Sequence, residues 1–226
     1  MLKGGVVKQT RYIAWLTLCV LVFYGQGLMA EPVEKFQEGL QYQRIDPPQP
    51  VTEPQGKVKV VEMFFYACPH CYTLEPKMQR WLKDKPYIDF QRIPAIVGPS
   101  WADQARAFYM ARELGRLDEL HPALFKAIHK DGKQIYNEFA VIDFFVKHGV
   151  PRDKALALYA SKKIQAAVNE ARVMTVKFGL RGVPAVIVNG RYKTAPFFVH
   201  NQEEMLEVLN TLVEKFRNKP EALSGK

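Results

Sequence analysis

Two cysteines close together in the sequence constrain this chain more than any other feature. Cys68 and Cys71 are separated by Pro69 and His70, and the third cysteine of the chain is Cys19. A disulfide that closes so short a loop removes little entropy from the unfolded chain, so structural stabilisation explains the pair poorly. A structural zinc site needs four ligands, and the histidines elsewhere show no paired ligand spacing. The pair is therefore interpreted as a redox centre.

The first thirty residues have the pattern of a secretory signal peptide. Three basic residues come first, an apolar run covers residues 13–23, and the segment ends on Gly-Leu-Met-Ala at Ala30, which suits cleavage. The run is shorter than the roughly 20 residues that cross a bilayer, so we expect cleavage rather than a membrane anchor. Cleavage removes Cys19 and leaves a mature chain that starts at Glu31, in an exported and oxidising compartment.

Composition indicates a globular protein and argues against nucleic-acid binding. Of the 226 residues, 48% are hydrophobic and 24% are charged, which is ample for a packed core. The formal net charge is +9, but Lys3, Lys8 and Arg11 of the leader supply three of these charges. The other basic residues are mixed with Asp and Glu and form no Lys/Arg run, so we predict no nucleic-acid partner.

The residues around the cysteine pair predict a strand, a turn and a helix. Residues 58–66 are rich in β-branched and aromatic side chains, as in a strand covered on both faces. Pro69 suits the first turn of a helix, and apolar residues recur at helical spacing after it, at Leu74, Met78, Trp81 and Leu82. Cys68 is therefore expected at the helix N-terminus and Cys71 in the first helical turn.

This placement predicts an oxidising disulfide. Free N–H groups and the positive end of the helix dipole stabilise a thiolate on Cys68 and lower its pKa. His70 adds a donor or a positive charge near the same sulfur. Stabilising the reduced form makes the disulfide a stronger electron acceptor, and Cys71 is expected to be the buried, resolving thiol.

Two acidic residues near the pair are candidates for tuning it. Glu62 shares one face of the strand with Val58, Val60 and Phe64, and this apolar face should be buried. A carboxylate there is costly unless it is functional or paired. Glu62 is either a proton acceptor for the cysteines or a strand-edge group that reaches water. Glu75 either tunes the site or is an exposed helical residue.

The rest of the sequence predicts a thioredoxin fold, of the α/β class, with an inserted helical domain. An Asn-Gly pair at 189–190 predicts a β-hairpin, and we treat the remaining histidines as ordinary surface or core residues: His121, His129, His148 and His200. The predicted division is a signal peptide at 1–30, thioredoxin-like parts at 31–98 and 166–226, and the inserted domain at 99–165. Further predicted elements are a strand at 88–94 and helices at 101–114, 118–130, 138–147, 152–178 (divided near 160–163) and 202–216.

Two motifs resemble the DsbA family of bacterial periplasmic thiol:disulfide oxidoreductases. The first is Cys68-Pro-His-Cys71 with the preceding Glu62-Met-Phe-Phe, and the second is Arg181-Gly-Val-Pro-Ala followed by Val-Asn-Gly-Arg-Tyr. The motifs lie over a hundred residues apart, and the resemblance covers essentially the whole mature chain. It implies that Pro184 has a cis peptide bond facing the cysteines and that the backbone of Val183 binds an extended substrate.

The resemblance also implies a function and partners. It implies a periplasmic monomer that oxidises unfolded or reduced exported proteins through a Cys68–Cys71 disulfide, with no other cofactor and no metal. Reoxidation would come from a DsbB-like, quinone-linked membrane partner. Phe197 and Phe198 either extend an apolar substrate surface or pack in the core.

Alternative functions remain open on the sequence alone. A disulfide isomerase or reductase can use the same scaffold, although such isomerases usually carry an N-terminal dimerisation domain, and only about 25 residues separate Ala30 from the first strong strand. A periplasmic chaperone that binds peptides without redox chemistry would keep its activity when Cys68 is replaced by serine. Binding to DNA or anionic membranes through the positive charge is a third alternative.

Overall fold

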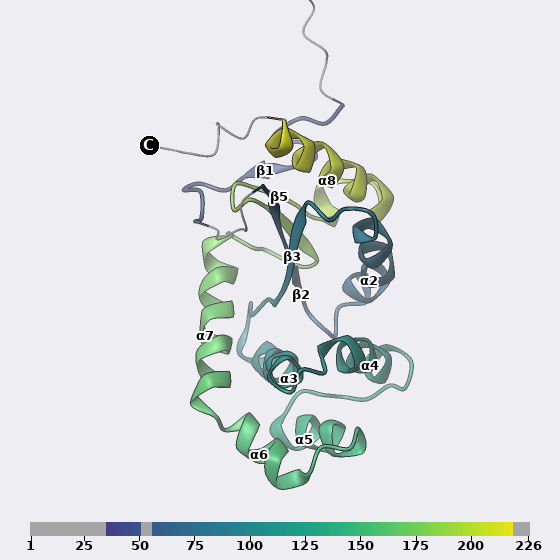
Figure 1. Cartoon of the computed structure of the whole chain (residues 1–226), viewed down its shortest axis with the longest axis vertical. Helices are drawn as coiled ribbons and strands as arrows, with labels where there is room; N and C mark the ends of the chain where they lie inside the picture. The colour runs from purple at the N-terminus through teal and green to yellow at the C-terminus, as the bar shows by residue number, and fades with distance from the viewer. Residues whose placement is uncertain (1–34, 51–55, 219–226) are drawn as a thin grey trace, which may run out of the picture. The chain divides into compact units, whose positions relative to one another are not determined.

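The computed structural model describes residues 35–50 and 56–218, and the predicted signal peptide lies outside these residues (Figure 1). The elements are β1 (Gln43–Arg44), β2 (Val58–Phe64), α2 (Pro69–Leu82), β3 (Ile88–Pro94), α3 (Ala102–Glu113), α4 (Leu117–His129), α5 (Glu138–Lys147), α6 (Arg152–Tyr159), α7 (Lys162–Lys177), β4 (Ala185–Val188), β5 (Tyr192–Thr194) and α8 (Gln202–Arg217). Short 3₁₀ turns cover Pro99–Trp101 and Pro196–Phe198.

The strands form one mixed sheet in the order β1-β5-β4-β2-β3. Strand β2 runs parallel to β3 and antiparallel to β4. Strands β4 and β5 form the predicted hairpin, and its turn residues Asn189 and Gly190 have φ of 47° and 63°. Both angles are left-handed, which is why an Asn-Gly pair suits this turn.

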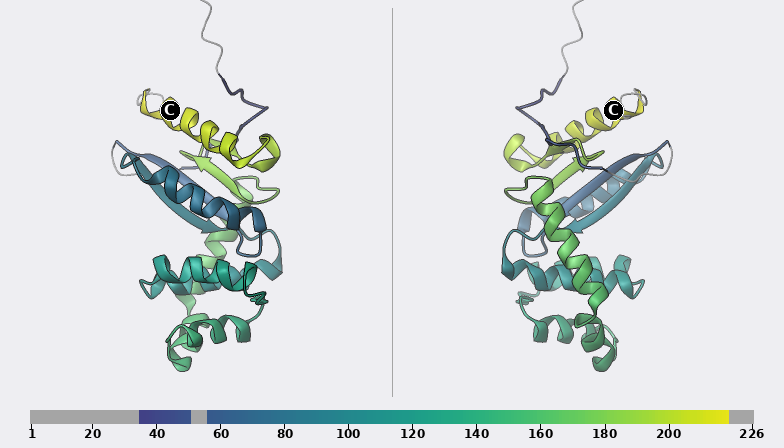
Figure 2. Two further views of the ribbon diagram at one scale, coloured as in Figure 1. Left: turned by 90° about the vertical axis from the view of Figure 1, so that its right-hand side faces the viewer. Right: turned by 90° about the vertical axis from the view of Figure 1, so that its left-hand side faces the viewer.

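Alternation along β2 sends its side chains into two different cores. Val58 and Val60 pack with residues of α2 and α8, whereas Val61 and Met63 pack with residues of the helices from α3 to α7. Figures 1 and 2 show α2 and α8 on one side of the sheet and α7 on the other. Because Glu62 alternates with Val61 and Met63, it belongs to the α2 side of the sheet.

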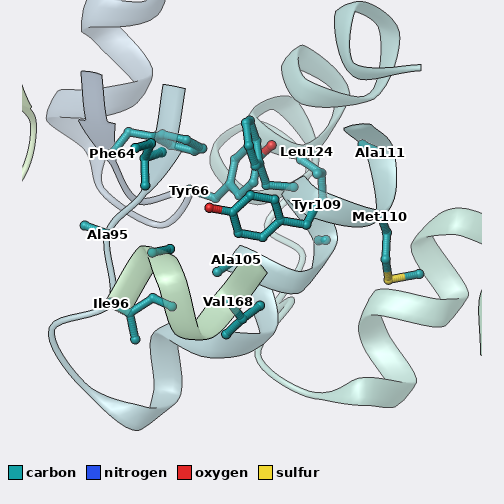
Figure 3. Close-up of a cluster of buried hydrophobic side chains, with 14 of the residues drawn as sticks. Phe64, Tyr66, Ala95, Ile96, Ala105, Tyr109, Met110, Ala111, Leu124 and Val168 are labelled. Carbon is teal, nitrogen blue, oxygen red and sulfur yellow. The ribbon is translucent and has the colours of Figure 1, made fainter. Parts of the chain in front are cut away.

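Helices α3 to α7 pack against the C-terminal half of β2 and the residues that follow it, and together they form one hydrophobic cluster. Figure 3 shows part of this cluster, in which Phe64 and Tyr66 lie near Tyr109 and Leu124. The hydrophobic cluster continues from the strands into the helices, and residues 36–218 belong to one compact unit. The predicted domain boundary between residues 165 and 166 falls within the continuous helix α7.

Most predicted elements are confirmed to within two residues. The predicted 152–178 helix is divided into α6 and α7, as expected. Strand β2 ends at Phe64 rather than at residue 66, because the Phe65 carbonyl accepts a hydrogen bond from the Cys68 N–H and the chain turns toward α2. Strand β1 was not predicted, since two residues are too short to show alternation. None of the helices within 35–50 and 56–218 has the length and apolar character needed to span a membrane.

Candidate active site

Cys68 is the N-cap residue of α2. Its backbone is extended, with φ −83° and ψ 117°, and its carbonyl accepts the hydrogen bond from the Tyr72 N–H at 3.1 Å. Pro69 follows at the first helical position, where a missing N–H is tolerated because that group has no partner within the helix. Both cysteines are free thiols, Cys68 partly exposed and Cys71 fully buried. The predicted placement of the pair at a helix start is therefore confirmed.

The surroundings of the two sulfurs drive their pKa values apart. Hydrogen bonding to the Cys71 thiol is the main cause that lowers the pKa of Cys68, to about 6. Backbone N–H groups of Cys71 and His70 and the charge of His70 act in the same direction, against partial burial. Burial raises the pKa of Cys71 well above its usual value, and the negative charges of Cys68 and Glu62 raise it further. At neutral pH one sulfur is a thiolate and the other a thiol.

This difference makes the alkylation rate of Cys68 a direct test of the site. In the reduced protein the rate is expected to follow a titration with a midpoint of about 6. Replacing His70→Ala is expected to raise the midpoint by about half a pH unit, since the imidazole charge is lost while the backbone N–H groups stay. Iodoacetamide kinetics measure both midpoints, and His148→Ala, at the end of α5, is the control histidine. A wild-type midpoint near the free-thiol value of about 8.5 would contradict the thiolate assignment.

The loop before β4 lies against the exposed sulfur. The Cys68 Sγ lies 3.4 Å from the Val183 carbonyl oxygen, to which it donates a hydrogen bond in its protonated form, although the two residues are 115 positions apart. The Val183–Pro184 peptide bond is cis, as the family resemblance implied, and Pro184 is buried. The two motifs therefore meet at one site.

Glu62 lies in the interior beside the active-site helix. Its side chain is 1% exposed, so the alternative of a strand-edge carboxylate that reaches water is wrong. Its Oε2 lies 3.4 Å from the Arg92 Nε and makes no hydrogen bond. Burial raises the pKa of Glu62, the nearby charge of Glu75 raises it further, and the Arg92 charge opposes both.

Glu75 is also buried, so the alternative of an exposed helical residue is wrong. Its side chain forms a two-pronged ion pair with Arg92, at 2.6 Å and 3.1 Å, and also bonds to Gln79 and His121. Sequence reasoning did not select Arg92 or His121. The sequence does hold a signal for Arg92, because it shares one face of the predicted strand with Ile88 and Phe90 and so places a cation on an apolar face.

The N-terminus of α8 is tied to the start of α2. Gln202 Nε2 donates to the His70 carbonyl at 2.8 Å and to Thr73 Oγ1 at 3.0 Å. Lys77 pairs with Glu203 at 2.7 Å beside these bonds. These contacts join segments about 130 positions apart, and nothing in the local sequence indicated them.

Phe197 and Phe198, which follow strand β5, differ in burial. Phe197 is 62% exposed, whereas Phe198, beside it, packs against the larger core cluster. Core packing therefore accounts for Phe198 and not for Phe197. Phe65, just before the cysteines, stacks on Trp101 with ring centroids 3.8 Å apart.

A thiolate at a helix start, a buried partner thiol and a cis-proline loop on a thioredoxin-like sheet together define a thiol:disulfide oxidoreductase. Within the described parts of the chain, no three His, Cys, Asp or Glu side chains cluster as a metal site would require.

Comparison with known proteins gives the same class. The DSBA-like thioredoxin domain family matches residues 87–209. Thiol:disulfide interchange protein DsbA of Burkholderia cepacia is 35% identical over 204 residues, which cover 90% of this chain and 96% of that protein. The DsbA of Pseudomonas aeruginosa is 34% identical over 190 residues, covering 84% and 90%.

Solved structures agree. The crystal structure of Pseudomonas aeruginosa DsbA has a TM-score of 0.77 at 33% identity and covers 83% of this chain and 98% of its own. That of the oxidoreductase DsbA from Xylella fastidiosa has a TM-score of 0.75 at 32% identity, covering 81% and 98%. The chain belongs to the DsbA family of thiol:disulfide oxidoreductases.

Proposed function

We propose that the protein introduces disulfide bonds into reduced exported proteins by exchange through a Cys68–Cys71 disulfide. The observation that carries this proposal is the acidic Cys68 thiol at the start of α2, in contact with the Val183 carbonyl and paired with the buried thiol of Cys71. A stabilised thiolate favours the reduced protein and so makes its disulfide oxidising.

The exchange has two steps. A substrate thiolate attacks the Cys68 sulfur, the Cys68–Cys71 bond breaks, and Cys71 leaves as a thiolate that takes up a proton. A second thiolate of the substrate then attacks the substrate sulfur of the mixed disulfide, which releases Cys68 as a thiolate. Two electrons pass from the substrate to the protein, and the products are a substrate disulfide and a reduced dithiol. No organic cofactor or metal takes part.

Glu62 is the proton carrier for Cys71 in this scheme. Its location beside α2, its burial and its raised pKa support a carboxyl group that is protonated near neutral pH. Its charge acts on Cys71, which supports their proximity. When Cys71 leaves, the carboxyl proton moves to the Cys71 sulfur, and the reverse transfer accompanies reoxidation.

Val183 and Pro184 hold the substrate next to the reactive sulfur. The backbone of Val183 offers hydrogen bonds to an extended peptide, as in strand addition, and the contact between its carbonyl and Cys68 Sγ supports this location.

The proposed setting is the periplasm, reached through the signal peptide at residues 1–30. There the protein acts as a monomer, and a DsbB-like, quinone-linked membrane protein returns the dithiol to the disulfide. The relatives' names support thiol:disulfide interchange, and the leader pattern supports export.

An oxidation assay tests the function. The oxidised mature protein is mixed with a reduced peptide containing two cysteines, and mass spectrometry follows the loss of two hydrogens from the peptide. One peptide disulfide per protein is expected, with no product from Cys68→Ser, since that variant has no redox disulfide.

Matched assays separate the alternatives. Insulin reduction and the repair of a scrambled disulfide protein are both expected to be slow compared with peptide oxidation. Faster repair than oxidation would favour an isomerase. Full activity of Cys68→Ser in preventing aggregation of a reduced client, without oxidation by the wild type, would favour a chaperone.

A further inference from the structure

A buried chain of hydrogen bonds connects the helical segment to the active-site helix. Tyr66 Oη lies 2.8 Å from His121 Nδ1, and His121 Nε2 lies 3.2 Å from Glu75 Oε2. The three residues are 1%, 3% and 6% exposed. The chain thus joins α4 to α2 through groups that the exchange steps above do not use.

The donors and acceptors in this chain have one consistent arrangement. An ionised Glu75 only accepts hydrogen bonds, so His121 Nε2 carries the hydrogen, and His121 Nδ1 then accepts from the Tyr66 hydroxyl. A doubly protonated His121 would leave the Tyr66 hydroxyl hydrogen without this acceptor, beside the rings of Phe64 and Phe125. Burial also lowers the pKa of His121, in agreement with the neutral ring. His121 is therefore a neutral donor to Glu75.

Two carboxylates compete for the Arg92 guanidinium. Arg92 makes two hydrogen bonds to Glu75, whereas it approaches Glu62 only to 3.4 Å without a hydrogen bond. Gln79 and His121 supply the other donors to Glu75. Burial raises the pKa of Glu75, but the His121 hydrogen bond and the Arg92 charge outweigh it and lower this pKa. Glu75 thus holds Arg92, and Glu62 is left without a hydrogen-bond partner for Oε2.

Ionisable groups from several elements face the two ends of this hydrogen-bonded chain. Glu62 faces Glu75 and Cys71 on α2 and Arg92 on β3, and β4 places Val186 opposite it. The groups that act on His121 are Glu75, Arg92, Asp118 and Tyr66.

We infer that His121 is a positioning residue for the redox site: its hydrogen bond to Glu75 keeps Arg92 on Glu75 and leaves Glu62 free to exchange a proton with Cys71. The inference rests on the proposed function, in which Glu62 carries that proton. The step moves one proton between the Glu62 carboxyl and the Cys71 sulfur and moves no electrons.

The test is the titration of the Glu62 carboxyl in His121→Leu. Without the His121 donor, the ionised form of Glu75 is less stable, and the Arg92 side chain turns toward Glu62. The pKa of Glu62 is therefore expected to fall by about one unit, the size of the hydrogen bond that its carboxylate gains from Arg92. Carbon-13 NMR of the Glu-labelled, reduced protein measures this pKa, with the Glu62 signal identified by its loss in Glu62→Gln.

Two variants control for a general disturbance. His121→Gln retains an N–H donor for Glu75 and is expected to keep the wild-type titration. His129→Leu alters the same helix, where His129 bonds to the Tyr66 carbonyl at 2.7 Å and stacks on Tyr72, and is expected to leave the titration unchanged. A shift in His129→Leu equal to that in His121→Leu, or a leucine-like shift in His121→Gln, would overturn the inference.

A further variant covers failure of His121→Leu to fold. Glu75→Gln keeps the side-chain shape, removes the competing charge and is expected to lower the pKa of Glu62 at least as far. An unchanged Glu62 titration in a folded His121→Leu or in Glu75→Gln overturns the positioning role while leaving exchange at Cys68 intact. Failure of the wild type to oxidise the dithiol peptide instead overturns the proposed function.

Discussion

A Cys71→Ala variant is expected to stay covalently joined to the first disulfide peptide it meets. In the reduced variant the Cys68 thiolate attacks the peptide disulfide and forms a mixed disulfide. The wild type resolves this species through Cys71, which lies in the first turn of the same helix, whereas alanine offers no such sulfur. A stoichiometric adduct, seen by mass spectrometry under non-reducing conditions, is the expected result.

The matched variant Cys68→Ala is expected to form almost no adduct. Its remaining thiol, Cys71, is fully buried, and burial raises its pKa, so it stays almost entirely un-ionised at pH 7. The Cys68 thiolate is the major form at the same pH. Equal adduct yields from the two variants would contradict the assignment of Cys68 as the nucleophile.

Replacing Arg92→Met is expected to give the largest loss of stability among these variants, about 3–5 kcal/mol at pH 7. The substitution leaves the buried Glu75 carboxylate without its charged partner and removes the cation near Glu62. Urea unfolding at a series of pH values measures the loss.

The pH dependence of this loss has a definite sign. The pKa of Glu75 is lowered in the folded wild type, so its contribution to stability is present above the unfolded pKa, about 4.3, and is lost as the pH falls through the folded pKa. The difference between Arg92→Met and the wild type should therefore be largest at neutral pH and shrink toward acid. Glu75→Gln added to Arg92→Met should recover part of the stability, because it removes the stranded charge.

Lys77→Met provides the control for loss of an ion pair. Lys77 pairs with the exposed Glu203, and pairs of this kind contribute little to stability. A loss in Lys77→Met as large as that in Arg92→Met, or a loss in Arg92→Met that does not change with pH, would contradict the role given to the buried pair.

Local patterns were sufficient to predict the setting of the cysteines. Pro69 after Cys68 and the apolar spacing of Leu74 and Met78 predicted the helix start, and Asn189-Gly190 predicted the hairpin. These features depend on neighbours in sequence, where backbone preferences decide the structure.

Contacts between distant segments were not predicted. Arg92 meets Glu62 because β3 lies in parallel register with β2, and His121 reaches Glu75 because α4 packs near α2. Single-chain periodicity carries no information on such pairings, so the surroundings of Glu75 became clear only in three dimensions. The resemblance to a known family supplied the cis bond at Pro184, which spacing alone could not.

The unequal burial of the two sulfurs has a consequence for the order of events. Cys68 is partly exposed to solvent, whereas Cys71 is fully buried. A molecule that delivers electrons and one that removes them must therefore dock at the same sulfur and take turns there. Because both molecules use the same exposed sulfur, they cannot bind at the same time, and ping-pong kinetics are the expected result.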